Sequence, residues 1–382
     1  MDCCPSQRDI DFWRALEKQV FFLYKYVLAL VLRNVRCLSD FQACCCSWFV
    51  GRRPIRAHLY PQYFLLMNTE NTDFYAFGEI LWDCLPSGRH AGGAPFNVTC
   101  HLVQLGVSAS LISAVGQDAL GDKILELARQ KGVVVKFVGR ARNGLPTGTV
   151  LASVDAMGNA TYNIVQPVAW DEIAFSEEAL DAVGKAKAFI FGSLATRSPY
   201  NLGQLKRLLE VRGPLKFFDV NLRPPFADPK HIVGLAAHAD ILKLNHDEVG
   251  QIASWLRTGE AAHNPPSSTS SVAEACAIFS EATRVPRICV TMGAAGAALW
   301  DRGSLVWAPA PKVDVKDTVG AGDSFMAALM VGLTRGTDNQ KVLETACRLG
   351  AMVASHDGAT PALPQEIIQE FRANLGSTSA PQ

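Results

Sequence analysis

A regular alternation of segments after residue 67 constrains the fold most strongly. Short runs rich in β-branched and aromatic residues alternate there with segments of helical periodicity. The β-rich runs are 74–81, 110–116, 188–193, 216–221, 241–245 and 287–293, and examples of the helical segments are 118–132 and 272–282. This alternation predicts an α/β fold with a mainly parallel central sheet covered by helices on both faces. Ligands of such sheets bind beyond the carboxyl ends of the strands, so polar residues at those ends are the candidate site.

Two further runs show polar alternation, which is not typical of a buried strand. Residues 147–155 and 161–165 are joined through the sequence AMGNA, and together they predict a β-hairpin. We interpret this hairpin as part of a small β-lid that projects from the main domain. Residues 263–271 are rich in Pro and Ser and predict a surface loop.

Residues 1–66 differ in composition from the rest of the chain. They hold six of the eleven cysteines, and they carry nine basic and five acidic side chains. The remaining residues carry 27 basic and 31 acidic side chains, so the charge balance is reversed. Cys44, Cys45 and Cys46 are adjacent and lack the spacing of a zinc site, so they stay unassigned.

The apolar run VFFLYKYVLALVL, residues 20–32, is a candidate membrane segment. It is shorter than the roughly 20 residues that a membrane-spanning helix needs, and Lys25 interrupts it. Acidic residues before the run, and the lack of a clear cleavage site after it, disfavour a signal peptide. A helix at the membrane surface, formed by residues 12–36, remains an open alternative.

The net charge of the whole chain excludes one class of partner. The 36 basic side chains are balanced by 36 acidic ones, which gives no electrostatic footprint for nucleic acid. We therefore expect a small-molecule partner, no nucleic acid, no membrane insertion and a cytoplasmic location. The sequence has no G-x-x-x-x-G-K-[ST] motif, and GAGDSF lacks the G-x-G-x-x-G spacing. A P-loop kinase and a Rossmann dehydrogenase are therefore disfavoured.

The stretch VKDTVGAGDSFMAALMVGL, residues 315–333, places Asp323 where a glycine-rich loop becomes an apolar helix. One interpretation is a helix cap, because Asp accepts hydrogen bonds from exposed amides at a helix start. The other begins with Gly320 and Gly322, which lack Cβ atoms and allow several backbone N–H groups to converge on an anion. A carboxylate beside such a site is useful when it accepts a proton while negative charge passes nearby. Phosphoryl transfer to a hydroxyl group fits this second interpretation.

Several motifs now indicate a family. The sequence DTVGAGDSF resembles the C-terminal signature of the PfkB (ribokinase-like) sugar kinases, and GGAPFNV, residues 92–98, resembles their N-terminal signature. The bacterial-type fructokinases are the branch that the chain resembles most, through GEILWD, PTGTV, AWDEI, GSLATRSP and DVNLRPP. The resemblance implies a ribokinase-like three-layer sandwich with a small β-lid. It covers residues 67–376, which leaves a flexible tail at 377–382 and an unrelated extension at 1–66. We expect that extension to be disordered or weakly packed, or to precede a native start at Met67.

The resemblance also assigns roles to individual residues. It assigns catalysis to Asp323 with the turn Gly320, Ala321 and Gly322, sugar binding to Asp83, Gly92, Gly93 and Asn97, and ATP binding to Asn221, Arg223, Asn245, Thr291, Gly293, Gly296 and Gly358. It places Mg²⁺ at Glu248 through water, and a monovalent cation such as K⁺ at Asp317. Structural roles remain open for Asp83 as a turn residue, Asn97 as a helix cap and Glu248 as a solvated acid at a helix start.

The function implied by the resemblance is ATP-dependent phosphorylation of a sugar hydroxyl, with fructose converted to fructose 6-phosphate. Other acceptors remain open, namely ribose, a nucleoside and 2-keto-3-deoxygluconate, because a small change in a pocket redirects such a site. A non-catalytic relative that binds sugar or a partner protein is a further alternative. A membrane-associated kinase is another, if residues 12–36 form a surface helix. The resemblance also implies a homodimer that pairs through the lid.

Overall fold

The computed structural model describes residues 72–85, 88–154, 160–260, 266 and 268–376, all within the unit formed by residues 61–382. The expectations for residues 1–66 and for the tail at 377–382 therefore lie outside the described residues, as do the membrane-surface helix and the triple cysteine. Among the helices that are described, none is both long and apolar enough to cross a membrane.

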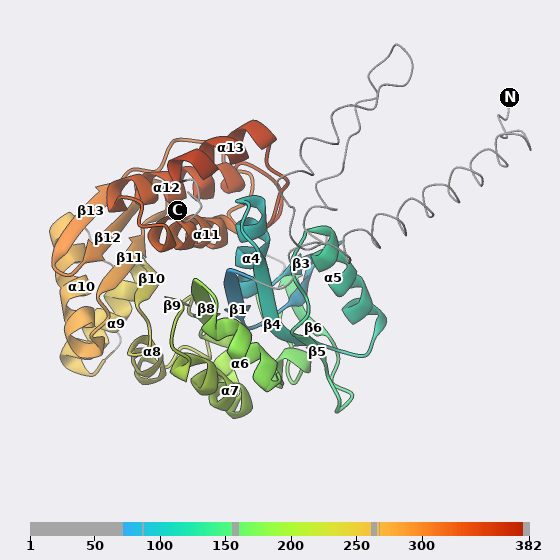
Figure 1. The fold of residues 1–382 in the computed structure, drawn as a ribbon. Helices are drawn as coiled ribbons and strands as arrows, with labels where there is room; N and C mark the ends of the chain where they lie inside the picture. The colour runs from blue at the N-terminus through green and yellow to red at the C-terminus, as the bar shows by residue number, and fades with distance from the viewer. Residues whose placement is uncertain (1–71, 86–87, 155–159, 261–265, 267, 377–382) are drawn as a thin grey trace, which may run out of the picture. The chain divides into compact units, whose positions relative to one another are not determined.

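A nine-stranded sheet forms the centre of the described unit, in the order β13-β12-β11-β10-β9-β8-β1-β4-β5 (Figure 1). In chain order its strands are β1 Phe74–Phe77, β4 Ala109–Val115, β5 Val138–Arg140, β8 Ala188–Gly192, β9 Leu215–Asp219, β10 Ile241–Asn245, β11 Arg287–Thr291, β12 Ala297–Asp301 and β13 Ser304–Ala308. The seven strands from β11 to β5 run parallel, and β12 and β13 extend that edge antiparallel. The prediction of a mainly parallel sheet is confirmed.

Helices cover both faces of this sheet (Figure 1). One apolar core includes residues of α4 Ala94–Gln104, α5 Ala119–Gln130, α11 Ala321–Thr334, α12 Asn339–Ala354 and α13 Gln365–Asn374. The second core includes residues of α6 Glu177–Gly184, α7 Pro199–Glu210, α8 Pro229–Ala236, α9 His246–Thr258 and α10 Thr269–Thr283. Successive side chains of a strand point to opposite faces, so Phe74 and Ala76 enter the first core while Tyr75 and Phe77 enter the second. Both faces are buried, which explains why the parallel strands are almost continuously apolar.

Two sequence expectations require correction. The run 74–81 is not one strand, because β1 ends at Phe77 and Leu81 already belongs to a second sheet. Gly78 separates the two with a φ of 149°, a conformation that favours glycine. The predicted loop at 263–271 also ends early, because Ser268 caps α10 and the helix begins at Thr269.

The second sheet has four strands in the order β3-β2-β6-β7. Its strands are β2 Leu81–Leu85, β3 Gly88–Gly92, β6 Gly148–Val154 and β7 Ala160–Ile164. The antiparallel pairing of β6 with β7 confirms the predicted hairpin. The sequence did not indicate that β2 and β3 join it, and this small sheet is therefore built from two separate segments of the chain.

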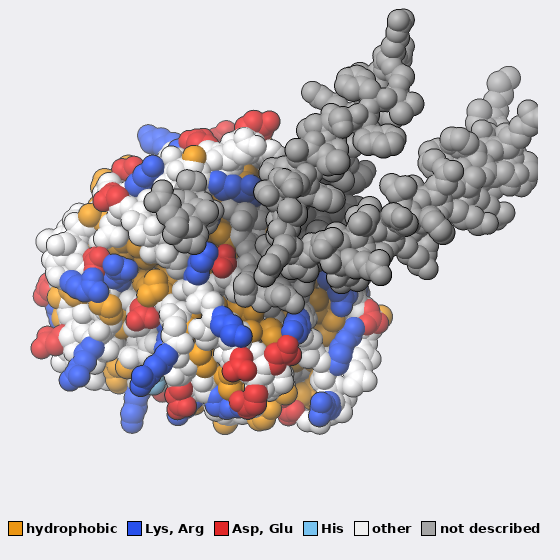
Figure 2. Space-filling view, viewed as in Figure 1, with side chains coloured by type: hydrophobic (Ala, Val, Ile, Leu, Met, Phe, Trp, Pro, Cys, Tyr) orange, Lys and Arg blue, Asp and Glu red, His pale blue; other side chains and the backbone are white. Residues whose placement is uncertain are grey.

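On the face shown in Figure 2, basic and acidic side chains of the described residues are interspersed. No large patch of one sign is visible among them there, which agrees with the balanced composition.

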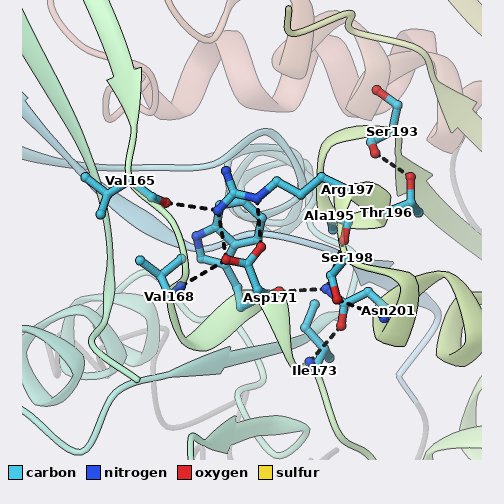
Figure 3. Close-up of polar contacts among 11 residues, drawn as sticks. Val165, Val168, Asp171, Ile173, Ser193, Ala195, Thr196, Arg197, Ser198 and Asn201 are labelled. Atoms are coloured by element: carbon cyan, nitrogen blue, oxygen red, sulfur yellow. Dashed lines mark hydrogen bonds and ion pairs between the residues drawn. The ribbon is translucent and has the colours of Figure 1, made fainter. Parts of the chain in front are cut away.

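A buried ion pair holds the base of the small sheet to the large one (Figure 3). Arg197, at the end of the 3₁₀ helix η2 Leu194–Arg197, donates from Nε and Nη2 to the carboxylate of Asp171 at 2.7 and 2.9 Å. Its Nη2 also donates to the carbonyl of Val165, one residue beyond β7, at 2.9 Å. The guanidinium carbon lies 3.9 Å from the ring centroid of Trp170, in cation–π geometry. The segments 169–173 (AWDEI) and 192–199 (GSLATRSP) thus meet at the bidentate contact between Asp171 and Arg197.

Asp171→Asn should destabilise the fold strongly, because it leaves the charge of Arg197 buried without a counter-charge. The Arg197 side chain is only 2% exposed, and breaking such a pair costs about 3–5 kcal/mol. Urea denaturation at neutral pH measures the loss. Glu178→Gln is the matched control, because its ion pair with Lys136 is solvent-exposed and should contribute less than about 1 kcal/mol. Equal losses in the two variants would show that the buried pair has no special role.

Candidate active site

A cavity of about 860 Å³ opens where the large sheet, the small sheet and the first turns of α4 and α11 meet. Residues at the carboxyl ends of β8 and β9 line it, as expected for a parallel sheet. It brings together ten of the residues singled out from the sequence: Asp83, Gly93, Asn97, Asn221, Arg223, Asp317, Gly320, Gly322, Asp323 and Gly358. Segments from residue 83 to residue 358 therefore converge on one site.

Asp323 lies in the first turn of α11, but it does not cap that helix. The N-cap is Gly320, with a φ of 80°, and the helix start has no side-chain capping hydrogen bond. A Cβ atom on Gly320 would collide with the carbonyl oxygen of Ala359, so this position requires glycine for space as well as for φ. Instead, Oδ2 of Asp323 accepts a hydrogen bond of 2.8 Å from Nδ2 of Asn97 on α4.

The surroundings of Asp323 keep its carboxyl group partly protonated near neutral pH. The group opens toward the cavity, but protein encloses it elsewhere, and this burial raises its pKa to about 6. The hydrogen bond from Asn97 lowers the pKa, the nearby charge of Asp219 raises it, and Lys243 and Arg223 lower it. A group with this pKa is mostly ionised at pH 7 and can accept a proton.

Asn97 connects the start of α4 to Asp323. Its side chain is buried, and Oδ1 has no hydrogen-bond partner among the described residues. Asn97 is the fourth residue of the helix, so it is not the N-cap, and the capping interpretation is wrong. The N-cap is Gly93, with a φ of 107°, and a Cβ there would collide with the backbone of Glu79.

Asp83 lies within β2, opposite His90 of β3, rather than just after a strand of the large sheet as expected. This corrects the interpretation of Asp83 as a turn residue. Burial raises the pKa of the Asp83 carboxyl group, and His90 and Arg223 lower it. A Cβ on Gly92 would collide with this carboxylate, so Gly92 supplies space for Asp83 although it does not line the cavity itself.

Several other candidates lie outside the cavity lining: Ala321, Asn245, Glu248, Thr291, Gly293 and Gly296. Asn245 and Glu248 form a capping box at the start of α9. The Glu248 oxygens accept hydrogen bonds from the backbone of Leu222 at 2.7 Å and of Asn245 at 2.8 Å. Glu248 is therefore buried rather than solvated, and burial raises the pKa of its carboxyl group.

The glycines after β11 have a clear structural role. Gly293 begins the 3₁₀ helix η3 Gly293–Ala295, which links β11 to β12. Gly296 has a φ of 102°, and a Cβ there would collide with the carbonyl oxygen of Ala308 on β13. The close approach of two strands therefore explains Gly296 without any contact to ATP.

Asp317 and Gly358 are joined by a hydrogen bond at the rim of the cavity. Oδ1 of Asp317 accepts from the backbone of Val319 at 3.0 Å, and Oδ2 accepts from Gly358 at 3.2 Å. Asn221 also lines the cavity, with a φ of 40°, a conformation that Asn tolerates better than most residues.

Comparison with known proteins identifies the family. A model of the pfkB family carbohydrate kinases matches residues 71–366. The chain belongs to this family. Similar proteins include Probable fructokinase-4 of Arabidopsis thaliana (26% identity, covering 78% of this chain and 96% of that one) and Fructokinase of Escherichia coli (27%, 78% and 98%). Aminoimidazole riboside kinase of Salmonella typhimurium is as similar, at 27% identity over 76% of this chain and 91% of that one.

Solved structures share the fold of this pfkB-family chain. The sugar kinase PH1459 of Pyrococcus horikoshii has a TM-score of 0.66 at 25% identity, covering 79% of this chain and 99% of that one. Arabidopsis thaliana ribokinase, solved with ribose and ATP, has a TM-score of 0.64 at 21% identity, covering 79% and 99%. A ribokinase II of E. coli, solved with ATP and Mg²⁺, has a TM-score of 0.64 at 21% identity, covering 78% and 98%. The ribokinase-like fold predicted from the sequence is confirmed.

Three charged residues of this pfkB-family site were missed in the sequence. Asp219 and Lys243 lie on neighbouring strands and form a buried ion pair. Glu79 follows β1, lines the cavity, and has one carboxylate oxygen without a partner among the described residues. Burial raises the pKa of Glu79 to about 7, although backbone hydrogen bonds and Arg223 lower it. The available signal was a charged residue within an otherwise apolar run, as in FYAFGEIL and ILKLN.

Proposed function

We propose that this pfkB-family chain transfers the γ-phosphoryl group of ATP to a hydroxyl group of a sugar, with fructose as the first acceptor to test. The position of Asp323 is the observation that carries this proposal. Its carboxylate lies in the cavity at a glycine-rich helix start, is held by Asn97 and makes no capping bond. A base beside an anion-binding turn is the combination that phosphoryl transfer to a hydroxyl requires.

In the proposed reaction, Asp323 accepts the hydroxyl proton while the sugar oxygen forms a bond to the γ-phosphorus. The bond from that phosphorus to the bridging oxygen breaks, and ADP leaves with the electron pair. Backbone N–H groups of the first turn of α11, those of Gly322 and Asp323, stabilise the charge on the transferring group. Arg223 lines the same cavity and supplies a mobile positive charge for phosphate oxygens.

The proposal includes a magnesium ion held through water, with Glu248, which does not itself line the cavity, as its protein carboxylate. Among the described residues there is no cluster of three or more His, Cys, Asp or Glu side chains that could enclose a metal. Mg²⁺ usually keeps several waters and takes one or two carboxylates together with substrate phosphates. Each oxygen of Glu248 accepts one backbone hydrogen bond, from Leu222 or from Asn245, and retains a lone pair for a metal-bound water. When bound, the ion neutralises charge on the ATP phosphates.

Three finer expectations remain part of the proposal. Asp83 and Asn97 bind sugar hydroxyls, because both line the cavity beside Asp323. Asp317 contributes to a K⁺ site near the turn, together with backbone carbonyl groups. Two copies pair through the small sheet, whose outer residue Leu151 is 48% exposed.

Asp323→Asn should lower kcat at least about a hundredfold, because an amide is not an effective base. The hydrogen bond from Asn97 can still be accepted and no buried charge is added, so the fold should stay intact and the affinity for sugar nearly unchanged. Asp338→Asn is the matched control, since Asp338 caps α12 with hydrogen bonds to the backbone of Gln340 and Lys341 and lies outside the cavity lining. It should leave kcat unchanged. Retention of more than about a tenth of kcat in Asp323→Asn, with transfer rate-limiting, would show that the proton leaves by another route.

The ionisation of the Asp323 carboxyl group also predicts how kcat/KM depends on pH. Protonated Asp323 cannot accept a proton, so kcat/KM should fall about tenfold per pH unit below the pKa of about 6, and it should be level above it. Steady-state rates measured across this range at constant ionic strength test the expectation. A profile that stays flat well below pH 6 would contradict a base with the pKa of Asp323.

The acceptor can be identified with a screen of ATP consumption by the full chain. We expect fructose to raise turnover most among fructose, ribose, glucose, adenosine and 2-keto-3-deoxygluconate. The reason is the set of motifs shared with fructokinases, whereas the similarity to a riboside kinase keeps the nucleoside in the screen. Greater stimulation by another acceptor would replace fructose, and no stimulation by any of them would contradict the sugar-kinase proposal.

A further inference from the structure

Lys243 has a buried position that a lysine rarely occupies. It is the middle residue of β10, where Leu242 and Leu244 enter the core beneath α8, α9 and α10. Alternation along the strand directs the Lys243 side chain to the opposite face, which α4 and α11 cover. The side chain is 9% exposed. Burying an ammonium group is costly unless it is paired, so a buried Lys243 requires an acidic partner.

Asp219 is that partner. It lies opposite Lys243 on β9, and both of its carboxylate oxygens are 2.9 Å from Nζ. Burial alone would lower the pKa of Lys243, but the ion pair with Asp219 raises it overall, so the group stays charged. An ammonium group has three N–H donors, and the two Asp219 oxygens account for two of them. Both residues line the cavity, which leaves one donor for a ligand there.

The position of Nζ relative to the glycine turn suggests which ligand. Nζ lies 3.5 Å from the point where a Cβ atom on Gly322 would stand. Gly322 directly precedes Asp323, so the ammonium group lies against the side-chain-free face of the first turn of α11. Backbone N–H groups of a helix start and a lysine ammonium both favour phosphate oxygens, and here they face the same space.

We propose that Lys243, fixed by Asp219, binds the terminal phosphoryl group of the nucleotide beneath Gly322. This inference rests on the proposed function, because it assumes that ATP occupies the cavity. Asp219 neutralises the ammonium group when no phosphate is present, and the third donor then engages the phosphoryl oxygens as they arrive. Lys243 should therefore distinguish a nucleotide with a γ-phosphate from one without it. A lysine that served only to pair Asp219 within the core would not make that distinction.

The test compares binding of ADP with binding of the β,γ-imido analogue of ATP, both with Mg²⁺, by calorimetry on the full chain. Lys243→Met alone leaves Asp219 unpaired, so the principal variant is Asp219→Asn combined with Lys243→Met. Replacing both partners avoids leaving either charge buried and unpaired. Lys187→Met is the matched control, because its ion pair with Asp73 is solvent-exposed and neither residue lines the cavity.

The double variant should bind the ATP analogue at least about tenfold more weakly while its affinity for ADP changes less than about twofold, as expected for loss of a charge-assisted hydrogen bond. The Lys187 control should change neither. Equal weakening of both nucleotides would overturn the inference, because it would mean that the pair only shapes the site. Unchanged binding of both would also overturn it. If the unmodified chain binds neither nucleotide, the proposed function fails, and this inference fails with it.

Discussion

Burial of both faces of the large sheet determines where this chain can place polar chemistry. Strands enclosed by two helical layers must be apolar, so charged side chains are confined to strand ends or must be paired inside. The cavity lies at the carboxyl ends, where Asp219 and Asn221 emerge from β9 and the first turns of α4 and α11 point inward. The helix starts add unpaired backbone N–H groups to the same space. The backbone alone therefore makes this region favourable for an anion.

The same enclosure raises the pKa of Asp323 at a cost in stability. Burial raises its pKa from 3.8 to about 6, so the folded state binds the proton more tightly than the unfolded chain does. The stabilisation from this group is present at low pH and is lost as the pH rises through about 6, where the carboxylate ionises. Lys243 and Arg223 offset part of this penalty because both favour the ionised form. A strained electrostatic balance of this kind is typical of functional sites.

The sequence predicted the layers of the fold because hydrophobic periodicity reports directly on burial. It predicted ten residues of the cavity lining because strand ends and glycine turns leave local signals. It could not show that β2 leaves the large sheet, since FYAFGEIL reads as one run and only the φ of Gly78 divides it. Nor could it separate glycines that approach a neighbouring strand, such as Gly296, from glycines that face a ligand. The Asp219–Lys243 pair was invisible for a related reason, because pairing across strands depends on register.

The arrangement also explains why the phosphoryl-transfer chemistry is easier to infer than the acceptor. Two of the groups proposed for phosphoryl transfer, Asp323 and Lys243, lie on α11 and on β10 of the large sheet. The opposite wall of the cavity consists of side chains from the small sheet, among them Leu81, Asp83, His90, Val150 and Ile164. These side chains belong to β2, β3, β6 and β7, which are separate in the sequence from the turn at Asp323. Substitutions in the small sheet can therefore change the shape of the pocket around the acceptor while the turn at Asp323 stays in place.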